Sequence, residues 1–374
     1  MSRRQKRYER RMQKRTDKLN SKVGKNLNFD AVCDFEALYN SAFKAAKGVR
    51  WKISVQRYLL NVLINTVKLQ RRLEKLKDVR QGFIKFIVNE RGKVRHISSV
   101  HFRERVVQKA LCTYAFSPVI SRSLITDNGA SQKGKGTTYA INRITSHLRK
   151  HCYKNGNKGY ILLIDFKSYF DNINHEKLKE VFRKFFDDEK ILKYTDDFIN
   201  AFGDKGLGLG SETSQTGAIV FINDIDHFIK EKLSIKAYGR YMDDSYIILP
   251  SKNALEDVLQ CLIKKYEEFG ITVNKKKTYI TDLKHGFMFL KTRFYITDTN
   301  FAIKKACRDS IVRERRKLKR QAKLYEQGIL TKDDIHTSFV AWEGSLKRKH
   351  AKTSVRNMKL LYNSLFTKGE MKND

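Results

Sequence analysis

A pair of aspartates between two short strand-like segments is the feature that most limits the fold of this chain. Ala237–Tyr241 and Tyr246–Leu249 are rich in aromatic and apolar residues and stand a few residues apart, which is the pattern of a β-hairpin. Asp243 and Asp244 then lie in a tight turn, where their carboxylates can reach a metal ion. The pair alone is weak evidence, because other aspartate pairs are most simply solvated surface pairs: Asp187-Asp188, Asp196-Asp197 and Asp333-Asp334.

A second carboxylate follows the apolar run Tyr160–Ile164, which ends at Asp165. A continuous run of this kind predicts a strand buried on both faces. If that strand neighbours the hairpin, Asp165 lies beside Asp243. Nucleotidyl transfer needs two divalent ions about 3.5–4 Å apart, and Mg²⁺ prefers oxygen ligands while keeping water or phosphate in its shell. We therefore predict Asp165, Asp243 and Asp244 as the catalytic and metal-binding residues.

The charge of the chain indicates a polyanionic partner. Its 77 Lys and Arg residues outnumber its 40 Asp and Glu residues, for a formal net charge of +37 over 374 residues. Such a field repels itself unless a polyanion neutralises it, and nucleic acid is the usual one. The alternative is a solubilising or membrane-surface charge.

The cysteines and the apolar segments indicate where such a protein works. The five cysteines are scattered, without a C-x-x-C pair or a Cys/His cluster, which argues against a zinc site and against a secreted disulfide framework. No apolar run approaches the length of a membrane span. We expect a soluble cytoplasmic protein without a membrane partner.

Two basic segments are candidate nucleic-acid contacts. Residues 1–28 hold eleven Lys and Arg and two acidic residues, which fits a disordered tail or an arm that orders on RNA or DNA. Residues 127–137 form a loop rich in Gly and Lys. The loop lacks the spacing of an ATPase P-loop, but its backbone N–H groups can still hold a nucleic-acid phosphate.

The spacing of apolar residues predicts the other elements. We expect basic-faced helices over 29–79, a hairpin of 83–88 with 94–97, and a helix over 103–116 that stops near Pro118. A long helix should run from the glycine-rich segment 206–215 to about residue 232. Further helices are expected at 139–150, 175–186, 191–202, 255–269, 308–323 and 353–366, and a strand pair at 287–294.

At this point the chain resembles a known family. Tyr241-Met242-Asp243-Asp244 matches the Y-x-D-D box of reverse transcriptases, and Asp165–Ile173 resembles the aspartate motif that precedes it. The similar segments keep the family order from Gly82 to Phe294. The resemblance implies an α+β right-hand polymerase, with a palm of a small antiparallel sheet on helices. The implied ranges are a basic arm (1–28), fingers (29–150), a palm with interleaved fingers elements (151–295) and a basic helical thumb (296–374).

The resemblance also implies an activity and a set of site residues. The activity is RNA-directed DNA synthesis from dNTPs with two Mg²⁺ ions, or Mn²⁺ in their place. Phe170, five positions after Asp165, stands at the steric gate that excludes a ribose 2′-OH, although a core Phe is the alternative. The implied dNTP contacts are Arg95, Phe166, Phe170, Leu209, Gly210, Gln215 and Lys277, and the implied primer grip is Phe289, Leu290 and Lys291.

The glycine-rich motif indicates a subtype. Leu209-Gly210 stands where many reverse transcriptases have Gln-Gly, and Ser214-Gln215 stands where they have Ser-Pro, which resembles the enzymes of diversity-generating retroelements. Arg103–Val107 and Ala341–Lys347 are similar to that group, while Ser211 and Glu212 depart from it. Antiphage-defence reverse transcriptases share much of the pattern and are the alternative.

The implied partners are a structured noncoding RNA template, nascent DNA, dNTPs and a small accessory protein. A two-metal nuclease or a non-catalytic RNA-binding scaffold are rival functions from other classes. The nuclease would use the same carboxylates without needing the Phe170 gate, and the scaffold would leave those carboxylates without a purpose.

Overall fold

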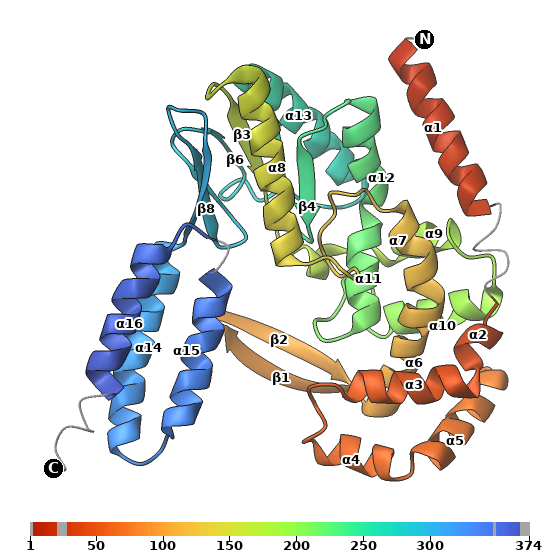
Figure 1. Cartoon of the computed structure of the whole chain (residues 1–374). Helices are drawn as coiled ribbons and strands as arrows, with labels where there is room; N and C mark the ends of the chain where they lie inside the picture. The colour runs from red at the N-terminus through yellow and green to blue at the C-terminus, as the bar shows by residue number, and fades with distance from the viewer. Residues whose placement is uncertain (1–2, 21–27, 91, 347–348, 367–374) are drawn as a thin grey trace. The chain divides into compact units, whose positions relative to one another are not determined.

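The computed structural model describes residues 3–20, 28–90, 92–346 and 349–366. It has the predicted α+β composition, with helices and small antiparallel sheets (Figure 1). The chain divides into two compact units. The first comprises Met1–Ala140, Leu163–Ile247 and Glu256–Tyr279, and the second comprises Ile141–Leu162, Ile248–Leu255 and Ile280–Asp374.

The hairpin that carries the aspartate pair forms as predicted. Strands β4 (Tyr238–Tyr241) and β5 (Asp244–Leu249) are antiparallel, and Tyr241 pairs with Asp244. Met242 and Asp243 therefore form a two-residue turn, and Asp244 is the first residue of β5 rather than part of the turn.

These strands belong to a four-stranded sheet in the order β4-β5-β3-β6. Strand β3 (Tyr160–Ile164) matches the predicted buried strand, and its last four residues are buried. Because β3 is hydrogen-bonded to β5, the sheet places the strand that precedes Asp165 next to the strand that begins at Asp244. Strand β6 spans Tyr279–Asp282.

The second predicted hairpin also forms. Strands β1 (Phe83–Glu90) and β2 (Lys93–Val100) are antiparallel over their whole length. Their turn includes Gly92, whose φ of +80° is a left-handed conformation that glycine adopts without steric cost. Helix α3 (Phe35–Ala46) packs on α6 (Phe102–Ala110), the helix that follows β2.

Helices account for most of the remaining first unit (Figure 1). The basic arm contains α1, while its residues 1–2 and 21–27 lie outside the described residues. The helices and helical turns not yet given are α1 (Arg3–Asn20), α2 (Asp30–Cys33), α4 (Ile53–Leu60), α5 (Val62–Glu74), η1 (Leu111–Phe116), α7 (Ser117–Ser123), η2 (Phe170–Asn172), α9 (His175–Arg183), α10 (Glu189–Asn200), α11 (Glu212–Phe221), α12 (Asn223–His227) and η3 (Phe228–Lys232).

Two helix predictions are wrong in detail. The helix that begins at 102 does not stop near Pro118, because α6 continues through the π-helical turn η1 into α7, and Pro118 lies in the first turn of α7. The proline has no N–H to donate, and it is accommodated where the π-helical turn changes the hydrogen-bond register of the helix. The expected long helix up to residue 232 is interrupted at Ile222, which separates α11 from α12.

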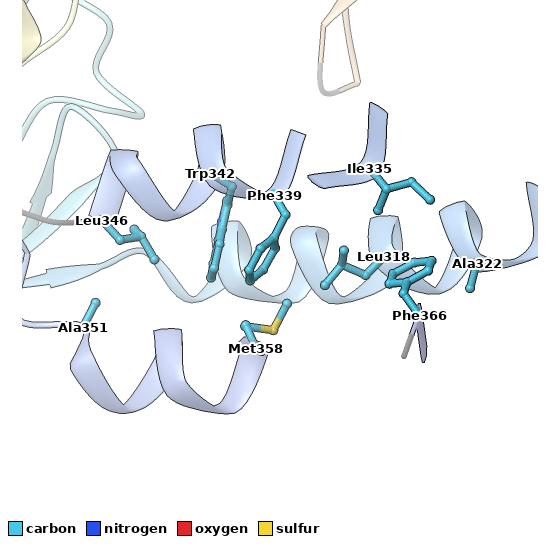
Figure 2. Close-up of a cluster of buried hydrophobic side chains, with 9 residues drawn as sticks. All are labelled: Leu318, Ala322, Ile335, Phe339, Trp342, Leu346, Ala351, Met358 and Phe366. Atoms are coloured by element: carbon cyan, nitrogen blue, oxygen red, sulfur yellow. The ribbon is translucent and has the colours of Figure 1, made fainter. Parts of the chain in front are cut away.

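The second unit contains a three-stranded sheet and a helical bundle. The sheet order is β7-β8-β9, with β7 at Phe287–Phe289, β8 at Thr292–Ile296 and β9 at Ala302–Ala306. Helices α14 (Arg308–Glu326), α15 (Lys332–Leu346) and α16 (Lys352–Phe366) share an apolar core (Figure 2). Phe339 and Trp342 stack in this core with ring centroids 5.7 Å apart.

Two longer helices, α8 (Thr137–Asn155) and α13 (Lys252–Glu268), contain residues of both units. In the described part of the chain, no helix combines the length and the apolar character that crossing a bilayer requires.

Candidate active site

Asp165 is fixed by the segment that precedes β6. The backbone N–H of Asn274 donates to the Asp165 carbonyl oxygen at 2.8 Å, and its side-chain Nδ2 donates to Asp165 Oδ1 at 2.9 Å. Lys277 Nζ lies 3.2 Å from Oδ1 and 3.1 Å from Oδ2 of the same carboxylate. The sequence motif that contains Lys277 thus meets Asp165, and its lysine neutralises that carboxylate.

The turn that holds Asp243 has an unusual backbone. Met242 has a φ of +56°, a left-handed conformation that few residues with a side chain adopt. Gly239 is required nearby, because a Cβ at this position would lie 2.7 Å from the Tyr246 hydroxyl oxygen. The tight approach of β4 and β5 therefore fixes where the turn can lie.

The three aspartates share one electrostatic environment. Burial raises the pKa of Asp243, and the charge of Asp165 raises it further. Burial, Asp243 and Asp165 raise the pKa of Asp244 to about 6, against the opposing effect of Lys277 and Lys93. Each carboxylate disfavours the ionised form of its neighbour. A bound cation relieves this repulsion and therefore stabilises the three ionised aspartates.

The donor set fits a hard divalent cation, although the carboxylates do not form a closed cage. Over the described ranges, no three acidic, histidine or cysteine side chains converge on a point that could hold a metal. Mg²⁺ does not need such a cage, since one or two carboxylates suffice when phosphate and water supply the remaining oxygens. The residues that would hold it are Asp165, Asp243 and Asp244.

Two aromatic residues of the Asp165 motif differ in exposure. Phe166 is buried, with its ring 4.7 Å from that of Tyr266 and 5.3 Å from that of Tyr169. Phe170 begins η2 and is only half-buried, and its carbonyl oxygen accepts from the Leu207 N–H at 2.8 Å. The ring of Phe166 thus belongs to the core, whereas the ring of Phe170 is partly accessible.

The glycine-rich loop is attached to the β1–β2 hairpin. The Leu209 carbonyl oxygen accepts from the Ser98 N–H at 3.0 Å, and Leu209 forms a parallel bridge with Ile97. Gly210 has a φ of +114°, and a Cβ there would lie 3.2 Å from Ile97 Cγ2. The Leu209-Gly210 signature therefore provides a close backbone contact between the loop and β2.

The start of α11 is tied to α6 by a chain of buried polar side chains. Ser211 caps α11 by accepting from the Ser214 N–H, and its hydroxyl donates to Gln108 Oε1 at 2.9 Å. Gln108 Nε2 in turn donates to Glu104 Oε1 at 3.0 Å. Two motifs that looked separate in the sequence, 103–107 and 206–215, are thus physically connected.

Two adjoining hollows lie beside the glycine-rich loop and the start of α11. One, of about 630 Å³, is lined by Gly210, Gln215 and Tyr241, and the other has a volume of about 590 Å³. Their combined lining contains five lysines and Arg105, and its single carboxylate, Glu212, is paired with Lys109 at 2.9 Å. Six residues line both hollows and make them one basic trough: Lys44, Lys109, Ser131, Gln132, Glu212 and Thr216.

The other predicted contacts lie on the two hairpins. Arg95 is exposed on β2, with its Nε 3.1 Å from Glu90 Oε2. In the second unit, Phe289 is buried at the end of β7, and Leu290 and Lys291 form the turn to β8 with φ values of +46° and +58°. The predicted primer-grip segment is therefore a tight two-residue hairpin.

The sequence patterns assign no role to Arg240, Asp226 or Asn274. Asn274 had a detectable signal, since it precedes the lysine run that contains Lys277. Arg240 had one as well, because a single charge inside a short apolar strand must find a buried acidic partner. Nothing in the sequence identified Asp226 as that partner.

Comparison with known proteins identifies the family. The reverse transcriptase (RNA-dependent DNA polymerase) family matches residues 74–294, more than half of the chain. The chain belongs to the reverse transcriptase family. The predicted membership is therefore confirmed, and the match contains all three aspartates, together with Arg95, Phe170, the glycine-rich loop, Lys277, and strand β7 with the turn that follows it.

Individual relatives of this reverse transcriptase are distant. Protein YkfC of Escherichia coli (strain K12) is 22% identical over 250 residues, covering 56% of this chain and 65% of that protein. Telomerase from Candida albicans, solved with the TWJ fragment of telomeric RNA, is 15% identical with a TM-score of 0.50, covering 83% of this chain and 60% of that chain. A truncated apo telomerase from Candida tropicalis is 17% identical with a TM-score of 0.45, covering 60% and 54%. The chain thus spans less than two thirds of each relative.

Proposed function

We propose that this reverse transcriptase synthesises DNA from dNTPs on an RNA template. The observation that carries the proposal is the electrostatic grouping of Asp165, at the exit of a buried strand, with Asp243 and Asp244 at a two-residue turn. Such a group of carboxylates is poorly stable without cations. Two-metal nucleotidyl transfer supplies cations at this kind of site.

The three aspartates are proposed to hold two Mg²⁺ ions, with Mn²⁺ as an alternative. When bound, the ions would neutralise the charge on the primer 3′ oxygen and on the leaving pyrophosphate. Lys277 must leave Asp165 for that carboxylate to bind a cation fully. We propose that Lys277 then faces the pyrophosphate. The same side chain would thus neutralise the Asp165 carboxylate before the cations bind and the leaving group during the reaction.

The basic trough is the proposed path of the single-stranded template. It begins beside Gln215 and Tyr241 and continues along Lys44, Lys109 and Lys133. Lysines with neighbouring hydroxyl groups suit contacts to a phosphate backbone, which provides most of the affinity for nucleic acid. Arg95, Gly210 and Gln215 are the proposed contacts of the incoming dNTP, and Phe289, Leu290 and Lys291 of the primer.

The proposed role is copying of a dedicated structured noncoding RNA in a retroelement of the diversity-generating type, with a small accessory protein as a further partner. Leu209-Gly210 and Ser214-Gln215 support this subtype. The same pattern supports the alternative role, an antiphage-defence enzyme that makes cDNA from its own noncoding RNA. Functionally, we assign residues 29–150 to fingers, 151–295 to a palm and 296–374 to a thumb.

Primer extension tests the polymerase function and the metal ligands together. We expect Asp165→Asn and Asp243→Asn each to lower dNTP incorporation on primed RNA by about 1,000-fold, since several kcal/mol of charge stabilisation is lost. Asp333→Asn, which changes an aspartate on α15, should incorporate at the wild-type rate. Full incorporation by Asp165→Asn or Asp243→Asn would show that the carboxylates are wrongly assigned.

The same preparations separate the rival functions. Labelled RNA incubated with Mg²⁺ and no dNTP should remain intact, whereas a two-metal nuclease would degrade it. A non-catalytic scaffold would bind the primed RNA without extending it. Sequencing the cDNA bound to the purified protein would then identify the template, and with it the retroelement or defence role.

A further inference from the structure

Arg240 is a buried charge that takes no part in the proposed chemistry. It lies on β4 and is only 1% exposed. Among the described residues, it is the largest side chain that is fully buried. An ionised group in such a place must be paired. Its partner is Asp226 of α12, whose carboxylate accepts from Arg240 Nε at 2.9 and 3.0 Å and from Nη2 at 2.6 Å.

Asp226 does more than neutralise the charge of Arg240. Asp226 also accepts a hydrogen bond from the hydroxyl of Tyr238, two residues before Arg240 on the same strand. Burial opposes the charge of Arg240, but Asp226 outweighs it and raises the pKa of the guanidinium. Arg240 is therefore a permanent cation with a fixed orientation.

The remaining donors of the guanidinium connect the catalytic turn to α11. Nη1 donates to the carbonyl oxygen of Met242 at 3.1 Å, and Nη2 donates to the carbonyl oxygen of Ile219 at 2.7 Å. Ile219 lies on α11, the helix that carries Gln215. One rigid planar group therefore contacts α12, α11 and the residue that precedes Asp243.

The contact with Met242 has a specific consequence. Met242 is held in the left-handed region, where its side chain makes the conformation unfavourable. Such a conformation persists only where surrounding contacts impose it. The hydrogen bond from Arg240 is a contact of that kind, because it binds the carbonyl of the strained residue itself.

We propose that Arg240 is a positioning residue for nucleotide incorporation, whose guanidinium holds the Met242–Asp243 turn in its left-handed conformation and fixes that turn relative to α11. The inference rests on the proposed polymerase function. Lysine cannot replace this arginine, since an ammonium group is a point charge without the planar fork that reaches three acceptors at once.

A merely structural role makes a different prediction. If Arg240 only neutralises Asp226, then removing both charges should restore the protein completely. Arg240→Met/Asp226→Asn does this, because it leaves an oxygen acceptor for Tyr238 and an apolar chain of similar length in the core. Paired removal of a buried ion pair is often neutral for stability, but it cannot restore the bond to Met242.

The test is single-turnover incorporation of dTTP on oligo(dT)-primed poly(rA) with excess enzyme and Mg²⁺. Under these conditions an unfolded fraction lowers the amount of active enzyme but not the rate constant of the folded complex. Thermal unfolding and the affinity for the primed template are measured alongside. Arg183→Lys is the matched control, since Arg183 forms a partly exposed pair with Asp196 at 2.7 Å.

We expect Arg240→Lys and Arg240→Met/Asp226→Asn to lower the rate constant by about 100-fold, the loss that a displacement of about 1 Å produces. Template affinity should be unchanged, the double variant should unfold near the wild-type temperature, and Arg183→Lys should incorporate normally. A wild-type rate constant in either Arg240 variant overturns the inference alone. A wild-type protein that incorporates no dTTP overturns the proposed function and this inference with it.

Discussion

Phe170 combines a core-like surrounding with partial exposure. Its ring makes an edge contact with Tyr169 at 6.0 Å, and Tyr169 is itself fixed by a hydrogen bond from its hydroxyl to the Ala218 carbonyl. The backbone of Phe170 is held by Leu207, the first residue after Gly206 in the glycine-rich segment. We propose that the partly exposed ring, supported by Tyr169 on one side, excludes a substituent on the sugar.

Phe170→Ala should therefore relax sugar selection. We expect the ratio of ribonucleotide to deoxynucleotide incorporation to rise by roughly 10- to 100-fold, the usual value of one steric contact in a pocket, while dNTP incorporation changes little. The measurement is competitive primer extension with paired rNTP and dNTP. Phe182→Leu, which changes a buried ring of α9 away from the predicted dNTP contacts, serves as the control for general core damage. An unchanged ratio in Phe170→Ala would leave Phe170 as a core residue only.

The hydrogen-bonded link between helices α6 and α11 could not be predicted from local sequence patterns. Arg103–Val107 reads as an ordinary amphipathic helix, yet Glu104 is only 2% exposed and accepts hydrogen bonds from Gln108 Nε2 and from the Gln81 N–H. Burial raises the pKa of Glu104 to about 7, although these two hydrogen bonds lower it. The polar chain from Glu104 to Ser211 is thus anchored on a carboxyl group that titrates near neutral pH.

This titration predicts a pH-dependent stability. The folded protein keeps the Glu104 proton up to about pH 7, whereas the unfolded chain releases it near pH 4.5. Stability from this group is therefore complete below pH 4.5 and is lost as the pH rises to 7, by on the order of 3 kcal/mol. In thermal melts between pH 5 and 8, Glu104→Gln should gain stability relative to wild type as the pH rises. Glu180→Gln, at an exposed position, should show a constant difference, and a constant difference for Glu104→Gln would refute the prediction.

Elements with a strong local signal could be predicted, and those decided by tertiary contacts could not. The run Tyr160–Ile164 and the residues around Asp243 carry apolar patterns and turn spacings that fix a strand and a hairpin whatever surrounds them. The prediction that the helix stops near Pro118 was wrong, because the effect of a proline depends on its position in the helix. Here the π-helical turn η1 shifts the hydrogen-bond register just before it.

The candidate site divides in the same way. Asp165 and Asp243 could be selected because their positions relative to strands are local properties. Arg240 and Asp226 could not be paired, since fourteen residues and a change of element separate them. Asp188 was expected to be a solvated surface residue, but its side chain caps α10 and accepts from the distant Phe29 N–H at 2.7 Å. A contact across 159 positions leaves no trace in a single sequence.

At the scale of the molecule, the positive charge has two effects on nucleic-acid binding, one from the net charge and one from where the lysines lie. A net charge of +37 gives strong, salt-sensitive attraction to any nucleic acid, without selecting where a strand lies. We propose that the trough containing Lys44, Lys109 and Lys133 adds this selectivity, because it gathers lysine side chains beside Gln215 and Tyr241. A template with a single-stranded extension should therefore bind differently from a blunt duplex of the same length.

Lys44→Gln/Lys133→Gln tests this difference. Each phosphate contact to a single strand contributes about 0.7 to the slope of log affinity against log salt, so the double variant should lower the slope by about 1.4 for a primed RNA with a single-stranded 5′ extension. For a blunt duplex the slope should stay at the wild-type value. Lys236→Gln/Lys264→Gln removes the same charge from exposed positions outside the trough and should leave both slopes nearly unchanged. Equal losses for the two double variants would mean that net charge alone attracts the template, because only a defined track makes the position of a lysine matter.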